Sequence, residues 1–279
     1  MSHDNPHLGS PSPVDDDPWR ELRPTRWSTL GLGFVMLLTA AGLVTAVSTA
    51  VTGDFGTTVF LLLASLFFLH VTGLSLATRR YPRGSARPTL ATIDDGSTGL
   101  TFFFRRSMYY WTASFLTLLS LGLVLLALVL LPELMVVTIV LLLLALVPAA
   151  VVFLMLRRGR GQVTLTPDGV FHKGLAFTYF APWHAVLKVS PSEHQRSPMI
   201  AVTAAPAKET RTQRPMPSGF AGWEQRFYPM MAIMAQWLGS DPAVVYYTLR
   251  HYHETPEHRP ELALSNAVDR VNQRRFLLR

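Results

Sequence analysis

The chain has 279 residues, of which 49% are hydrophobic and only 15% are charged. An average soluble domain is about 25% charged, so this composition indicates a protein with several membrane-spanning segments. The chain contains no cysteine, which excludes disulfides, thiolate metal sites, iron–sulfur clusters and cysteine nucleophiles.

The N-terminal part predicts a tail followed by a helical hairpin. Residues 1–26 are rich in Pro, Ser, Asp and His, and we expect a disordered tail there. Two apolar segments follow, at residues 27–52 and 57–78, with a turn at residues 53–56 between them. Each segment is long enough to cross the hydrocarbon core of a bilayer as a helix. Small residues in the first segment, such as Gly42, predict that a neighbouring helix approaches closely.

His70 is the only ionisable side chain within the predicted membrane spans. An ionisable group at this depth is a functional candidate by default. The spans offer no acidic partner, so a proton relay through His70 would need water or hydroxyl groups. The sequence favours the alternative, in which His70 is neutral, hydrogen-bonded and structural.

The loop at residues 79–110 is hydrophilic, begins with Arg79 and Arg80, and carries Arg105 and Arg106 near its end. Its β-like runs at residues 89–93 and 100–104 flank a polar stretch that contains Asp95-Gly96, which predicts a β-hairpin. An isolated hairpin is barely stable in water. We therefore predict that residues 89–104 pair with, or pack on, a sheet formed by residues 162–204.

A second helical hairpin is predicted by residues 111–131 and 134–156, which are apolar on all sides. Glu133 is the only charged residue from Trp111 to Leu156 and lies in the break between the two segments. The fold class that follows is an α+β membrane protein. We expect a four-transmembrane-helix bundle of two hairpins over residues 27–156, with a separate module of β-sheet and helices.

The basic residues predict the orientation of this bundle. Three of the 25 Lys and Arg residues lie in the tail, six in residues 79–106 and 16 in residues 157–279, and none lies in the two short turns. Because basic segments stay on the cytoplasmic side, we expect both termini and the middle loop to be cytoplasmic. Only three of the 25 are Lys, a bias common in GC-rich bacterial genomes. We therefore expect a multi-pass protein of the bacterial inner (plasma) membrane.

Residues 157–279 are the only region long enough for a separate folded domain, and we predict an α+β module there. Strands are expected within residues 162–204, at residues 162–166, 170–173, 176–180, 186–190 and 199–203. A loop rich in Pro, Gly and basic residues follows at 205–222. Helices are expected within residues 227–276, at residues 227–238, 241–254 and 265–276, the second capped by Asp241-Pro242 and the third by Ser265.

His251, His253 and His258, with Glu254, form the densest cluster of possible metal ligands. Residues two apart do not share a helix face, and Thr255-Pro256 breaks the helix before His258. We expect a solvated helix end and no metal or other cofactor. The sequence contains no glycine-rich phosphate loop, no Gly-x-Ser-x-Gly elbow and no His-Glu-x-x-His motif, so we expect a protein that is not an enzyme.

The segment Val163-Thr-Leu-Thr-Pro-Asp-Gly-Val170, followed by Pro182-Trp183, resembles the opening of bacterial PH-like domains in multi-pass membrane proteins. The resemblance covers about residues 160–205, and residues 241–270 are similar to the ends of multi-pass proteins of actinobacteria. It implies a strongly bent sheet of seven strands closed by a helix, and a binding or scaffolding role. This sequence departs from that pattern, since it predicts about five strands there and at least three later helices.

The basic excess of the last region predicts a negatively charged partner. The candidate surface for anionic lipid or a protein partner has nine basic residues: Arg157, Arg158, Arg160, Lys208, Arg211, Arg214, Arg270, Arg274 and Arg275. Stacking aromatic residues are not interleaved with them, so we expect no nucleic acid. The function favoured is a scaffold or assembly protein of the lipid bilayer. The alternative is a small transport or export component in which His70 acts within the four-helix bundle.

Overall fold

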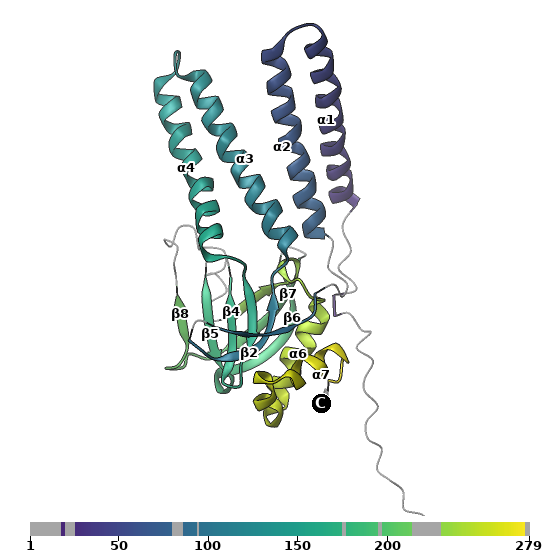
Figure 1. Ribbon diagram of the computed structural model, residues 1–279, viewed down its shortest axis with the longest axis vertical. Coiled ribbons are helices and arrows are strands. Elements are labelled where there is room, and N and C mark those ends of the chain that lie inside the picture. Colours follow the sequence, from purple (N-terminus) through teal and green to yellow (C-terminus); the bar gives the residue numbers. More distant parts are fainter. Residues whose placement is uncertain are drawn as a thin grey trace, which may run out of the picture. The chain divides into compact units, whose positions relative to one another are not determined.

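The computed structural model describes residues 18–19, 26–79, 86–93, 95–174, 177–194, 197–213 and 230–276 (Figure 1). The chain divides into two compact units. The sheet unit contains Met1–Leu22, Tyr81–Arg105 and Gly161–Arg279, and the helical unit contains Arg23–Arg80 and Arg106–Arg160.

Among the described residues, four helices are long and apolar enough to cross a membrane. They are α1 (Arg26–Val51), α2 (Phe55–Arg79), α3 (Arg106–Leu130) and α4 (Met135–Arg158). The predicted spans are confirmed as helices, although α3 begins five residues before the predicted start at residue 111. Large apolar side chains on their outer faces, such as Val129 and Val136, are 73% and 76% exposed. Exposing such apolar faces to water would cost free energy, whereas exposing them to lipid would not.

Small residues allow the helices of this unit to approach closely at two points. A Cβ added to Gly42 of α1 would clash with Ser65 Oγ of α2. A Cβ added to Gly73 of α2 would clash with the Trp111 ring of α3. By contrast, a Cβ at Gly31 or Gly33 would meet nothing within 4 Å. Close packing therefore explains some of the small residues of the first span and not others.

The first sheet of the sheet unit has six antiparallel strands in the order β1-β2-β3-β4-β5-β8. Their bounds are β1 Thr89–Thr92, β2 Thr98–Phe103, β3 Gln162–Leu165, β4 Gly169–Lys173, β5 Thr178–Pro182 and β8 Arg211–Gln213. Strand β2 pairs with β3, from Leu100 opposite Leu165 to Phe103 opposite Gln162. The prediction that the hairpin pairs with the later sheet is confirmed.

Two features make this β2–β3 seam specific. The Thr101 and Thr164 hydroxyls are buried and lie 2.9 Å apart, so each satisfies the other across the seam. Gly99 is required at its position because a Cβ there would clash with the Leu165 carbonyl oxygen. Segments that lie about 60 residues apart in sequence thus form one continuous sheet.

The second sheet has the order β6-β7-β9 and is followed by the C-terminal helices (Figure 1). The strands are β6 Val186–His194, β7 Ser197–Ala204 and β9 Met230–Met234. Single 3-10 turns precede β6 (η1, Trp183–Ala185) and follow β9 (η2, Ala235–Trp237). The helices are α6 Pro242–Glu254, the 3-10 helix η3 Pro256–Ala263 and α7 Ser265–Asn272. The two sheets and these helices share one core, which includes Phe102, Leu165, Ile200, Ile233 and Leu249.

The predicted helix at residues 227–238 is wrong over its described part. Residues 230–234 form β9, which pairs with β7 and places Ile233 opposite Ile200. Met, Ala and Ile are compatible with either structure, so the alternation that buries Met231 and Ile233 decided the outcome. The sequence offers no local signal for that distant pairing.

Other predicted bounds in the sheet unit also change. The strand expected at residues 176–180 lies at Thr178–Pro182, and β8 lies within the expected loop at 205–222. The last helix ends at Asn272 instead of residue 276, and its N-cap is Leu264, so the Ser265 side chain does not cap it. The helix predicted at 241–254 is confirmed, with the Asp241 side chain accepting from the Ala243 N–H at 3.0 Å.

The expectation of a disordered tail is wrong for Trp19. Its side chain is only 8% exposed and belongs to the main core. The indole N–H donates to the Ser192 carbonyl oxygen at 2.9 Å, and the ring lies edge-on to Tyr246 at 6.1 Å between centroids. Of the tail, only residues 18–19 and 26 are described. Trp19 therefore ties the described part of the tail to the core of the sheet unit.

Candidate functional site

The predicted basic surface is distributed over both units. In the helical unit, Arg157 and Arg158 end α4 and Arg160 follows it. The sheet unit contains Lys208, Arg211, Arg270, Arg274 and Arg275. Arg214 lies outside the described residues. Of the described members in the sheet unit, all except Arg270 are exposed.

Several of these basic residues already have acidic partners. Arg211 lies 3.5 Å from Asp95, and Arg274 lies 4.0 Å from Asp241. Both pairs are partly exposed, so each contributes little to stability and leaves the cation accessible. Arg270 differs, because its side chain is 23% exposed and forms a two-point ion pair with Glu261. Arg270 is therefore not part of the accessible basic surface.

Glu261 is the centre of a network that joins η3, α6 and α7. Its Oε1 accepts from Arg270 Nε at 2.5 Å and from the Tyr252 hydroxyl at 2.8 Å, and its Oε2 accepts from Arg270 Nη2 at 3.1 Å. Burial alone would raise the pKa of Glu261, but the bonds from Arg270 and Tyr252 outweigh it and hold that pKa below its usual value. Burial, followed by the bond to Glu261, raises the pKa of Tyr252 far above its usual range. Glu261 is thus a carboxylate and Tyr252 a neutral donor.

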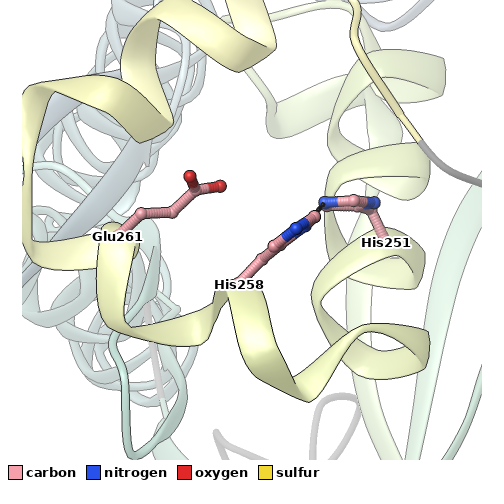
Figure 2. Close-up of side chains that lie close together, drawn as sticks. All are labelled: His251, His258 and Glu261. Carbon is pink, nitrogen blue, oxygen red and sulfur yellow. Dashed lines mark hydrogen bonds between the residues drawn. The ribbon is translucent and has the colours of Figure 1, made fainter.

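Two histidines lie beside this carboxylate (Figure 2). His251 on α6 and His258 on η3 face each other, with His251 Nε2 3.0 Å from His258 Nδ1. His251 is completely buried and His258 is half-buried. One ligand atom from each histidine and from Glu261 all lie within 4.8 Å of one another.

The expected solvated helix end is therefore wrong for His251. The chain turns at Thr255-Pro256, so η3 folds back and brings His258 against the buried ring of His251. Glu254 is not part of the group, because it pairs with Arg250 at 2.6 Å. Glu261 was missed at the sequence level, although it is three residues after His258, the spacing at which side chains on a tight helix share a face.

The turn itself is held by Arg259. Its Nε donates to the Tyr252 carbonyl oxygen at 2.9 Å and its Nη2 to the His253 carbonyl oxygen at 3.1 Å, which satisfies the end of α6. Its guanidinium also lies over the Trp183 ring, 4.9 Å from the centroid. Trp183 in turn donates to the Thr166 carbonyl oxygen at 2.8 Å, so the turn is fixed to the first sheet.

His70 lies in the helical unit, and its surroundings are apolar and aromatic. Its Nδ1 lies 2.9 Å from the Leu66 carbonyl oxygen, one helical turn earlier, and its ring is edge-on to Trp111 at 5.4 Å. No ion pair with His70 occurs among the described residues. These contacts satisfy one ring nitrogen and hold the ring against α3.

Comparison of the chain with models of protein families, with curated proteins and with solved structures finds no match.

Proposed function

We propose that this chain is a non-enzymatic scaffold protein of the bacterial inner membrane. In this proposal the four long helices cross the bilayer, and the sheet unit is a cytoplasmic PH-like module that binds anionic lipid head groups. A protein partner is the alternative ligand of the same module.

The observation that carries the proposal is the composite sheet. Strands β1 and β2 precede α3, and β3 follows α4, so one sheet is built from both sides of a helical hairpin. Only Phe104 and Arg105 separate β2 from α3, and only residues 159–161 separate α4 from β3. Two successive strands of this sheet are thus linked to the proposed membrane-crossing helices by only two or three residues. A module linked so closely to such helices is suited to binding the lipid surface.

The strand order supports the PH-like part of the proposal. Strands β2 to β5 form an antiparallel series, β6, β7 and β9 form a second, and α6 follows and packs against β6. These seven strands, here in two sheets, and the helix after them match in number the seven strands and closing helix that the resemblance implies. Strands β1 and β8 add one strand at each edge of the first sheet.

Exposed basic residues that form no ion pair among the described residues support a lipid ligand. Lys208 and Arg275 are exposed in the sheet unit, and Arg157 is exposed at the end of α4. Each basic side chain held near an anionic leaflet contributes about 1 kcal/mol, and this contribution is lost beyond a Debye length of about 8–10 Å. Two such residues in the sheet unit would therefore contribute about 2 kcal/mol.

The test uses the full chain in nanodiscs made from neutral lipid or from a mixture with anionic lipid. We expect hydrogen exchange around Lys208 and Arg275 to be slower in the anionic discs, and the difference to disappear at high salt because screening removes it. The double variant Lys208→Gln with Arg275→Gln should lose the difference. Lys188→Gln is the matched control, since Lys188 is exposed on β6 and lies outside the proposed surface. Equal exchange in both kinds of disc would contradict lipid binding and leave the protein partner.

A further inference from the structure

We propose that His251, His258 and Glu261 form a binding site for a divalent transition-metal ion, with Zn²⁺ as the best fit. This site is independent of the proposed lipid-binding role. It would join the end of α6 to η3, two elements that close the core of the sheet unit.

The ligand set suits zinc, and the three ligand atoms, which lie within 4.8 Å of one another, would have to move closer together to bind it. Two imidazole nitrogens and one carboxylate oxygen form a three-residue set that zinc accepts, with the fourth position taken by water. In a tetrahedral site with Zn–N of about 2.0–2.1 Å, two nitrogens are about 3.3 Å apart. His251 Nε2 and His258 Nδ1 are 3.0 Å apart, so a small separation of the rings is enough. Figure 2 shows the two rings facing each other and the Glu261 side chain extending toward them.

The proton between the two histidines need not leave the protein. In the neutral pair, one of the facing nitrogens carries a hydrogen and the other accepts it. Metal binding requires lone pairs on both facing nitrogens. The ring that now donates must therefore move its proton to its other nitrogen, a change of tautomer with no net proton release.

Glu261 is oriented as ligating carboxylates usually are. Arg270 and Tyr252 hold it by three hydrogen bonds, two at Oε1 and one at Oε2, so Oε2 retains a lone pair. Hydrogen-bonded carboxylates of this kind are the normal outer support of metal ligands. The Arg270 charge opposes a cation, so we expect weaker binding than in a cysteine-based structural site.

The Glu261 side of the proposed site borders an open pocket. Glu261 and Arg270 also line a polar pocket of about 330 Å³, which is completed by Asn266, Asp269, Gln273 and Arg275. His258 and Glu261 are half-buried, so a metal ion and the water that completes its coordination can reach them. His251 alone is fully enclosed.

The decisive experiment titrates the detergent-solubilised full chain, stripped with EDTA, with Zn²⁺ in a calorimeter and with Co²⁺ in a spectrophotometer. We expect one ion per chain, and absorption bands typical of tetrahedral Co²⁺. His258→Ala and Glu261→Gln should each abolish this binding. His184→Ala is the control, because the His184 side chain is 66% exposed and lies outside the group.

A thermal melt separates loss of a ligand from loss of folding. Zn²⁺ should raise the melting temperature of the wild-type protein and of the His184 variant, because binding to the folded state alone stabilises it. It should leave the His258→Ala protein unchanged, even if that variant melts at a lower temperature. Absence of binding to the wild type, or binding that survives His258→Ala, would overturn the proposal.

Discussion

Acidification should destabilise the sheet unit through His172. This residue lies on β4, opposite Val163 on β3 and Tyr179 on β5, and it is only 5% exposed. Its ring is 6.0 Å from the Phe104 ring. Burial lowers the pKa of His172 from 6.5 to about 4, so the folded protein holds the imidazole neutral.

The direction of the change in unfolding free energy depends on which state of the protein binds the proton at His172. Between pH 6.5 and about 4 the unfolded chain takes up a proton at His172 and the folded chain does not. The free energy of unfolding therefore falls as the pH drops through this window, and below about pH 4 the group has no further effect. From these two pKa values, the change from pH 7 to pH 5 costs about 1.8 kcal/mol, or roughly a 20-fold rise in the open population.

Hydrogen exchange of β4 amides in the detergent-solubilised full chain measures this quantity. After correction for intrinsic exchange rates, the free energy of opening should be lower at pH 5 by about that amount. His172→Phe keeps a ring in the core and removes the titrating group, so the part of the difference that comes from His172 should vanish. His184→Phe should retain it, because His184 is exposed. An equal pH dependence in wild type and His172→Phe would refute the reasoning.

Two further predictions concern the tail and the orientation of the chain. Trp19→Ala should destabilise the sheet unit by about 3 kcal/mol or more, as for other buried tryptophans, and Trp19→Phe should destabilise it by less. Both variants lose the hydrogen bond to the Ser192 carbonyl oxygen. Thermal melts measure the order of stability, and an unchanged melting temperature in Trp19→Ala would show that the indole contributes nothing. Single cysteines test the orientation: in intact cells an impermeant thiol reagent should label Glu133→Cys and spare Ser97→Cys, and the reverse pattern would place the sheet unit outside.

Local sequence determined the elements whose stability depends on solvent and on nearby residues. The four long helices follow from runs of apolar residues, because no other backbone arrangement of one segment satisfies its polar groups in lipid. The helix at Pro242–Glu254 follows from its Asp241 cap and the proline after it. The turn between β3 and β4 follows from Pro167-Asp168-Gly169, and the bond from the Thr166 N–H to the Gly169 carbonyl oxygen at 2.9 Å closes it.

Even one long-range pairing was accessible from sequence. The hairpin at residues 89–104 could not be stable by itself, so a partner sheet was required, and β3 supplied it. The low stability of an isolated hairpin requires a partner sheet but does not determine which residues pair, so the register could not be predicted. The Thr101–Thr164 bond and the need for Gly99 appeared only in the folded sheet.

Only the tertiary structure decided the features that depend on distant partners. Residues 230–234 became a strand because β7 had a free edge for them, and Trp19 was buried because β6 and α6 leave a site for an indole. The grouping of His251, His258 and Glu261 depends on the turn after α6, which Arg259 holds by bonds to two carbonyl oxygens and by its contact with Trp183. A side chain's local sequence sets its chemistry, but the burial and partners that tune this chemistry come from segments far along the chain.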